Sequence, residues 1–290
     1  MNRINRRSFM QAAAAAALSA GAPRVSLAEA AKPSCATSPV TLGKTGIVST
    51  LLGMGTGTQA SRKSSAQNRQ GRDAFMRTIA HAYERGLRYF DMSDSYGAHE
   101  YLRDAMREAS MDRSQVMLLT KTGAKHPEVC RADIERFRQE LQTDYLDIVL
   151  LHCMQSGDWA EKLKPCMDVL AEAKEKGLVR AHGVSCHNLD AMKVASEHPW
   201  VDVMLSRINP YGLHMDGTQE EVVGVLQRAW DNGKGMIGMK VAGEGKCADR
   251  LTESLRYVLG LGCIHAVTVG FIKPEEIDDT CRRVEEALRA

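Results

Sequence analysis

Residues 87–97 read LRYFDMSDSYG and combine a short apolar run with a polar turn. The chain becomes polar at Asp91, directly after Phe90, and a tyrosine follows five residues later at Tyr96. We interpret residues 87–91 as a buried strand and the following residues as a loop that leads into a helix. A carboxylate at a strand end and a phenol on the next loop can lie close together. Such a pair suits proton transfer to a carbonyl oxygen.

Two later apolar runs also end in polar residues. Residues 116–120 precede Lys121, and residues 147–151 precede His152. Strands that are apolar throughout are typical of a parallel sheet covered on both faces, and the carboxyl ends of such strands carry the chemistry of α/β barrels. The whole pattern predicts eight strand-then-helix units with short connections. Because polar strand ends converge only in a ring, we favour a single-domain (β/α)₈ TIM barrel with a hairpin at residues 41–46 over a doubly wound sheet.

The first 28 residues differ in composition from the rest of the chain. Residues 6–10 read RRSFM, an alanine run follows at residues 12–17, and small residues lead up to Ala28. This pattern is typical of a twin-arginine signal peptide, so we expect folded export to the periplasm or another extracytoplasmic space, with the export machinery as a partner. The predicted division is a signal peptide at residues 1–28, a linker at 29–40 and the barrel at 41–290.

The charge balance changes once the leader is set aside. The chain has 38 basic and 36 acidic residues, but four of the arginines and none of the acids lie in residues 1–28. The remaining chain therefore carries a net charge of −2. This gives no electrostatic case for nucleic-acid binding. No later apolar run is long enough to span a bilayer, so no stable membrane anchor is expected. The eight cysteines form no CxxC motif and leave disulfide pairing open.

Taken in order, these motifs resemble the aldo-keto reductase family over essentially the whole chain after the leader. The matching segments are residues 42–46, 90–97, 120–121, 150–152, 183–185 and 269–270. The leader, together with residues 183–188, makes the chain similar to an exported branch of that family. The resemblance implies reduction of an aldehyde or ketone, a small-molecule carbonyl substrate, by hydride transfer from NADH or NADPH.

The resemblance also implies roles for the four polar residues. Tyr96 would be the general acid that protonates the carbonyl oxygen. Lys121 would lower the pKa of the phenol, Asp91 would hold Lys121 charged, and His152 would place the substrate oxygen. Each residue alone also has a simpler explanation. Asp91 could cap a loop, and Tyr96 could pack in the core. Lys121 could be a solvated charge, and His152 could be a core histidine. Their agreement at four strand-end positions favours the catalytic interpretation.

A cofactor site follows from the same resemblance. The implied cofactor residues are Gly55, Thr56, Ser185, Cys186, Lys240, Gly270, Phe271, Ile272 and Glu276. Family members usually have asparagine at the position of Cys186 and an aromatic residue near Met239, and this chain has neither. Glu276 stands where NADP-preferring relatives often have arginine or glutamine. Because a carboxylate repels a 2′-phosphate and can accept a hydrogen bond from a ribose hydroxyl, NAD is a candidate beside NADP.

Two alternatives stay open at this point. The pairs at residues 152–153 and 186–187 could supply histidine and cysteine ligands to a metal, although neighbours on a strand face opposite sides. The barrel could also bind a nucleotide as a sensor or accessory protein without useful turnover, which the changed residues Cys186 and Met239 motivate. An exported reductase would further need to retain its cofactor or use a redox partner.

Overall fold

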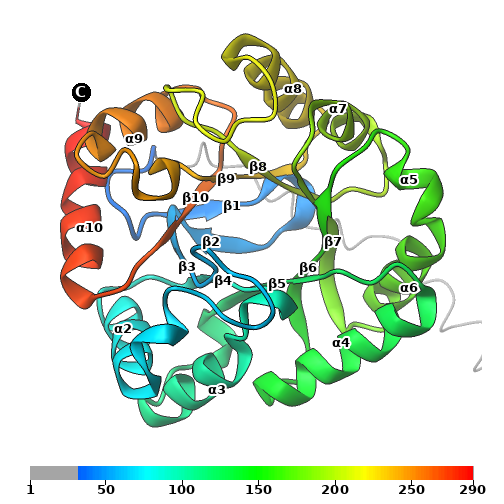
Figure 1. Cartoon of the computed structure of the whole chain (residues 1–290), viewed down its shortest axis with the longest axis horizontal. Helices are drawn as coiled ribbons and strands as arrows, with labels where there is room; N and C mark the ends of the chain where they lie inside the picture. Colours follow the sequence, from blue (N-terminus) through cyan, green and yellow to red (C-terminus); the bar gives the residue numbers. More distant parts are fainter. Residues whose placement is uncertain (1–31, 290) are drawn as a thin grey trace, which may run out of the picture. The chain divides into compact units, whose positions relative to one another are not determined.

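The computed structural model describes residues 32–289, and its centre is a closed barrel of parallel strands ringed by helices (Figure 1). The strands are β3 (Leu52–Gly55), β4 (Tyr89–Asp91), β5 (Met117–Thr122), β6 (Leu146–Met154), β7 (Val179–Cys186), β8 (Val203–Arg207), β9 (Gly235–Met239) and β10 (Ala266–Gly270). They neighbour one another in that order, and β10 pairs with β3 to close the ring. The predicted eight-stranded barrel is confirmed. The predicted signal peptide lies outside the described residues.

A hairpin precedes the barrel, as the glycines at residues 43 and 46 indicate. Strands β1 (Pro39–Thr41) and β2 (Val48–Thr50) pair antiparallel around the short helix η1 (Gly43–Thr45). The turn residues Leu42 and Ile47 are fully or almost fully buried and belong to the apolar cluster inside the barrel. Packed structure therefore begins before residue 41, within the segment that we expected to be a linker.

Eight longer helices cover the outside of the barrel. They are α2 (Arg72–Glu84), α3 (His99–Glu108), α4 (Pro127–Leu141), α6 (Lys164–Glu175), α7 (Leu189–Glu197), α8 (Gln219–Asp231), α9 (Leu251–Gly260) and α10 (Pro274–Leu288). The caps that the sequence favours are present: Asn188 accepts from two amides of α7, and Thr218, with Glu221 three residues later, forms a capping box at α8. The described residues include no helix with the length and apolarity needed to cross a membrane.

One predicted helix is wrong in its extent. Apolar residues recur at helical spacing from Trp159 to Leu170 and predict one helix, but the structure has α5 (Trp159–Lys162) and then α6, with Leu163 outside helical geometry between them. Pro165 explains the break, because proline has no backbone N–H to donate and its ring clashes with the preceding turn.

Strand alternation decides which side chains reach the barrel interior. On β5, Met117 and Leu119 belong to the interior cluster, while Leu118 packs outward against the helices. Because strand side chains alternate between the two faces, Lys121 continues the inward series at the carboxyl end of β5. The same reasoning places Asp91 two residues after the inward Tyr89. The barrel interior thus leads directly to a ring of polar side chains at one end.

Candidate active site

A buried ion pair forms the base of the site. The ammonium group of Lys121 contacts the carboxylate of Asp91 and donates a hydrogen bond of 2.8 Å to the carbonyl oxygen of Met92. Lys121 is 1% exposed and Asp91 is 5% exposed. Burial disfavours the ammonium form, but Asp91 and the phenol of Tyr96 outweigh it and raise the pKa of Lys121. Lys121 is therefore a permanent cation beneath Tyr96.

Tyr96 lies above this pair on the short helix η3 (Asp94–Tyr96), which follows β4. The Lys121 nitrogen is 4.9 Å from the centre of the Tyr96 ring. Burial of the phenol raises the pKa of Tyr96, and the nearby Lys121 lowers it by a smaller amount. The effect of Lys121 has the direction that we expected, but desolvation of the phenolate is larger, so the net shift of the pKa of Tyr96 is upward.

His152 meets Tyr96 edge-on, with ring centres 5.7 Å apart. Its Nδ1 lies 3.0 Å from the hydroxyl oxygen of Ser93, which fixes the orientation of the ring. Burial, followed by the positive charge of Lys121, lowers the pKa of His152 to about 3. The imidazole is therefore neutral at physiological pH. The pairing of β6 with β7 is irregular between Leu151 and Met154, so the strand changes course where His152 enters the site.

The segment after β3 packs against the tyrosine loop. Residues 59–70 are polar and rich in serine and arginine, a composition that predicts a mobile loop, yet the amide of Lys63 donates to the carbonyl of Ser95 at 2.8 Å. The side chain of Asn68 also donates to the carbonyl of Tyr96 at 3.1 Å. At Gly57, an added Cβ would lie 2.3 Å from the Tyr96 ring, so only glycine fits there. This segment forms one wall around the phenol.

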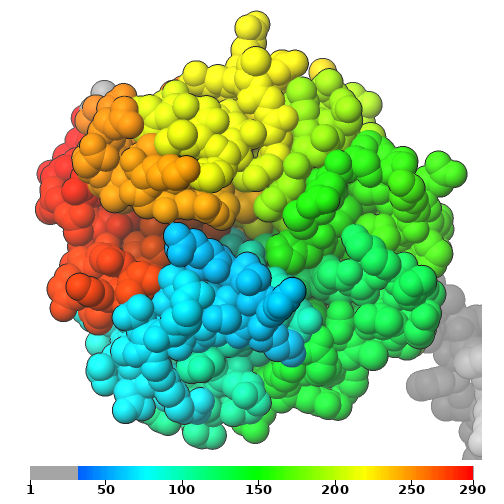
Figure 2. Space-filling model, in the orientation of Figure 1, coloured from blue at the N-terminus to red at the C-terminus, as the bar shows by residue number. Residues whose placement is uncertain are grey.

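A cavity of about 360 Å³ runs from Tyr96 toward the start of α10. Figure 2 shows the molecule hollowed between the segment after β3, in blue, and the segment after β9, in orange. Asp91 and Tyr96 line one end, and Glu276 and Thr280 line the other. The cavity therefore joins the four-residue cluster to the loops after β9 and β10.

The predicted cofactor residues divide into two groups. Six of them line the cavity: Gly55, Lys240, Gly270, Phe271, Ile272 and Glu276. Thr56, Ser185 and Cys186 are not part of its wall. Thr56 is buried and hydrogen bonds to the carbonyl of Asp91, and the hydroxyl of Ser185 accepts from the amide of Cys153 at 2.8 Å. Cys186 is fully buried among the residues that pack outward, because it follows the inward-facing Ser185 on the same strand. Its position does not support the expected cofactor contact.

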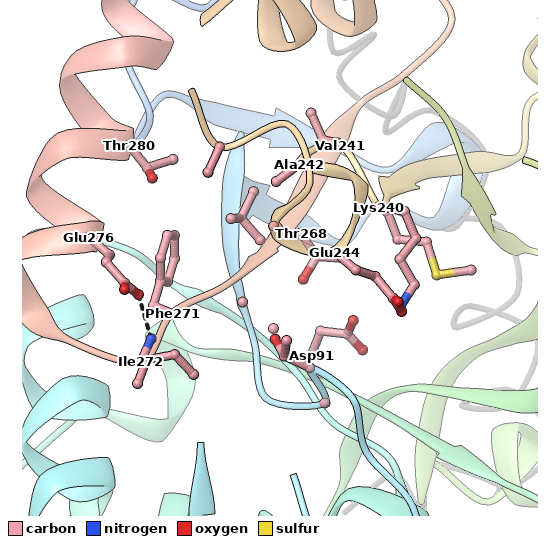
Figure 3. Close-up of a pocket in the computed structure, with 18 of the residues that line it drawn as sticks. Asp91, Lys240, Val241, Ala242, Glu244, Thr268, Phe271, Ile272, Glu276 and Thr280 are labelled. Atoms are coloured by element: carbon pink, nitrogen blue, oxygen red, sulfur yellow. Dashed lines mark hydrogen bonds and ion pairs between the residues drawn. The ribbon is translucent and has the colours of Figure 1, made fainter. Parts of the chain in front are cut away.

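Sequence reasoning did not assign several residues of the cavity wall to the cofactor site, among them His187, which it weighed only as a metal ligand, and Glu244. His187 lines the cavity, and burial together with the cations of Arg207 and Lys240 lowers its pKa to about 4. Glu244 also lines the cavity and forms an ion pair with Lys240, which Figure 3 shows on the wall opposite Glu276. Both residues follow strand ends in loops, where periodicity gives no signal. Within residues 32–289, no three His, Cys, Asp or Glu side chains gather as a metal site would require.

Comparison with known proteins agrees with the barrel fold. A model of the Aldo/keto reductase family matches residues 51–259. The chain belongs to the aldo/keto reductase family. Among solved structures, it is similar to one from Pseudomonas aeruginosa described as an aldo-keto reductase, with a TM-score of 0.72, 22% identity, and coverage of 89% of this chain and 98% of that one. The holo form of an aldo-keto reductase from Bacillus halodurans gives a TM-score of 0.70 at 14% identity, covering 87% and 95% of the two chains.

Curated relatives of this aldo/keto reductase match shorter segments of the chain at slightly higher identity. L-galactose dehydrogenase of Arabidopsis thaliana is 26% identical over 185 residues, which cover 60% of this chain and 56% of that protein. Methylglyoxal reductase DkgB of Salmonella typhi is 27% identical over 125 residues, or 42% of this chain and 46% of that protein. The matches thus span about half the length of these relatives. They place the chain in an oxidoreductase family without fixing its substrate.

Proposed function

We propose that this protein reduces an aldehyde or ketone to an alcohol, with NADH as the hydride donor. The observation that carries the proposal is the Tyr96 phenol, placed above the buried Lys121–Asp91 pair at the end of an elongated cavity. A reduced nicotinamide, when bound, supplies the hydride that reaches the carbonyl carbon. The residues of the chain then have to orient the carbonyl, provide a proton to its oxygen and keep water away.

Tyr96 provides the proton. Because burial raises its pKa, the phenol is fully protonated at neutral pH and is ready to donate to the carbonyl oxygen as negative charge develops there. The phenolate left behind is stabilised by the ammonium group of Lys121, which Asp91 keeps in place. The transfer forms an O–H bond on the product and leaves the negative charge on Tyr96 next to a fixed cation.

His152 orients the substrate in this proposal. Since its pKa is about 3, the ring stays neutral and brings no further positive charge next to Lys121. Ser93 holds Nδ1, which leaves the other ring nitrogen available to the carbonyl oxygen. A neutral imidazole can hydrogen bond to that oxygen without competing with Tyr96 as the proton donor.

Glu276 supports NAD rather than NADP. Its carboxylate accepts hydrogen bonds from the amides of Ile272, at 2.6 Å, and Lys273, at 3.4 Å, at the start of α10 (Figure 3). Amides at a helix start otherwise favour phosphate groups. Here the chain's own carboxylate already occupies them, and its charge would repel a 2′-phosphate. The close approach at Gly270, where a Cβ would lie 2.1 Å from the Thr58 hydroxyl, fits a narrow nucleotide channel.

The decisive experiment is to purify the protein after residue 28, identify any nucleotide that it carries, and titrate NADH and NADPH by fluorescence. We expect NADH to bind more tightly and a panel of aldehydes and ketones to oxidise it. Glu276→Gln should reduce the difference in affinity between NADH and NADPH. A clear preference for NADPH in the parent protein would remove the NAD assignment.

A catalytically weak nucleotide-binding barrel is the second candidate. It is favoured by the position of Cys186 in the core and by the absence of an aromatic residue at Met239 on the cavity wall. This candidate predicts nucleotide binding with no substrate-dependent oxidation of NADH across the panel. Measurable turnover that disappears in Tyr96→Phe would exclude it.

We also propose twin-arginine export to an extracytoplasmic space, supported by RRSFM at residues 6–10. Folded export would let the protein carry a cofactor bound before translocation, or meet a redox partner that reduces it afterwards. Replacing Arg6 and Arg7 by lysine should retain the protein in the cytoplasm, as measured by cell fractionation. Unchanged export of this variant would contradict the proposal.

A further inference from the structure

The charges on the cavity wall are strongly unbalanced. Among the described residues that line the cavity, Lys240 is the one lysine or arginine, whereas four side chains are carboxylates. Those carboxylates are Asp91, Glu244, Glu276 and Asp279. Asp91 is paired with the ammonium group of Lys121, and Asp279 is paired with Arg283 at 2.6 Å; neither cation lines the cavity. Glu276 accepts from backbone amides. Glu244 alone neutralises the cation that faces the cavity.

The Lys240–Glu244 pair is built into two loops. Lys240 directly follows β9 and has φ of +60°, and Glu244 in the short helix η5 (Gly243–Gly245) has φ of +58°. These are left-handed backbone conformations, which residues other than glycine rarely adopt. The second oxygen of Glu244 lies 3.6 Å from Nε2 of His214, a residue of the loop after β8 that also has a positive φ. The carboxylate therefore connects the two loops, and Figure 3 shows it beside the Lys240 amine.

We propose that Glu244 is an internal counter-ion of Lys240 that the pyrophosphate of a bound dinucleotide displaces, so that Glu244 sets the affinity for the nucleotide. This inference rests on the proposed function and concerns the same cavity. A pyrophosphate brings two negative charges into a cavity whose single cationic side chain is already paired. It gains a cation only if the Glu244 carboxylate moves away from Lys240.

Two features support this exchange. The hydrogen bond and charge of Lys240 lower the pKa of Glu244, so the carboxylate stays ionised and competes with a ligand at all physiological pH values. Glu244 also lies between Gly243 and Gly245, and the space around Gly245 is open. The pair is only partly buried, with 23% and 28% of the two side chains exposed, so its opening does not leave a charge in the core.

The test is a binding measurement that does not depend on turnover. Calorimetric titrations would use NADH, ADP-ribose, which retains the pyrophosphate, and adenosine, which lacks it. In Glu244→Gln we expect NADH and ADP-ribose to bind about five- to twentyfold more tightly, with a steeper loss of affinity as salt is added. Adenosine affinity should stay unchanged. Glu244→Asn, which tolerates a positive φ, serves as a second variant that should behave in the same way.

Two further variants separate a specific exchange from a general change in charge. Glu275→Gln removes an exposed carboxylate of α10 that does not line the cavity, and it should leave the affinities within twofold of the parent. In the Lys240→Gln background, Glu244→Gln should give a smaller gain than in the parent, because the cation that it frees is missing.

Equal or weaker binding of NADH and ADP-ribose to both Glu244 variants would overturn the inference, and so would an equal gain with and without Lys240. These results leave the proposed function intact as long as the parent protein binds NADH. If neither the parent nor any variant binds a nucleotide, the proposed function itself fails, and the inference fails with it.

Discussion

Two parts of the candidate site are built in different ways. Asp91 and Lys121 stand on strands β4 and β5, and both are almost fully buried. Lys240, Glu244 and Glu276 instead belong to loops or to a helix start; the first two are partly exposed and Glu276 is exposed. In the cluster on the strands, Asp91 and Lys121 balance each other's charge within the core. In the groove formed by the loops, Lys240 and Glu244 balance each other's charge at the surface of the cavity.

In the proposed reaction, this difference separates the part that does chemistry from the part that sets affinity. A cation fixed in the barrel wall would keep its position as Tyr96 loses its proton, which is what preorganised stabilisation requires. Ion pairs on loops can exchange partners, which is what a groove needs if a charged ligand is to enter and leave. The following predictions test that contrast, beginning with the largest effect.

Tyr96→Phe should lower kcat for carbonyl reduction about a thousandfold, since a general acid contributes about 10²–10⁴ in rate. The Kd for NADH should change less than twofold, because the hydroxyl belongs to the cluster and not to the groove. Steady-state kinetics and fluorescence titration measure the two quantities. Tyr101→Phe, on α3 and packed against Phe75, is the matched control. Retention of more than a tenth of the parent kcat would contradict the assigned role.

Breaking the buried pair should destabilise the protein more than breaking the pair in the groove. Asp91→Asn leaves the ammonium group of Lys121 buried without a counter-ion, so the free energy of unfolding should fall by about 3–5 kcal/mol. Lys240→Met removes the cation of a partly exposed ion pair and should lower the free energy of unfolding by less than about 1 kcal/mol. Urea denaturation measures both changes. Addition of Lys121→Met to Asp91→Asn should restore part of the loss, and equal effects at the two pairs would remove the contrast.

Acid should destabilise the protein through two buried histidines outside the proposed active site, His182 on β7 and His265 just before β10. Burial lowers the pKa of His182, which stacks on Trp200, and of His265, which stacks on Trp230, to about 4. Because the unfolded chain binds protons from about pH 6.5 downward and the folded chain does not, stability is lost between pH 6.5 and 4. Each histidine should contribute a loss of about 2 kcal/mol at pH 5. His182→Gln should lessen the fall measured between pH 7 and 5, and an equally steep fall would contradict this.

The smallest expected effect is that of pH on catalysis: kcat/KM for reduction should hardly change with pH around neutrality. Tyr96 keeps its proton beyond its usual range, and His152 is neutral above about pH 3, so neither group titrates near neutrality. Activity should stay constant between about pH 6 and 9 and decline only when the phenol ionises at higher pH. Stopped-flow rates of NADH oxidation would show this most directly. A clear ionisation near pH 7 would assign the proton to a different group.

The sequence predicted the strand-borne part of the molecule well, for a physical reason. On β5, residues 117, 119 and 121 share one face, so the inward direction of Lys121 follows from the alternation alone. Helix α3 begins and ends where its spacing predicts, at His99 and Glu108. The break at Leu163 was missed because the apolar spacing continues across it, although Pro165 was visible in the sequence.

The loop-borne part was less predictable. The inward-facing series on β7 ends at Ser185, so alternation already implied that Cys186 faces the helices, and the family position of that residue was the weaker guide. Glu244 gave no local signal, because its pairing with Lys240 depends on how a glycine-rich loop turns. The net pKa direction of Tyr96 also depends on burial, which requires coordinates.

Gly57 has a consequence for how this protein tolerates mutation. A methyl group at this position would overlap the ring of Tyr96, the proposed general acid, although glycine itself performs no chemistry. Alanine is one nucleotide change away from glycine, so an inactive variant is easily reached by chance. In a saturation scan of the gene, position 57 should be nearly as intolerant as the tyrosine that it accommodates.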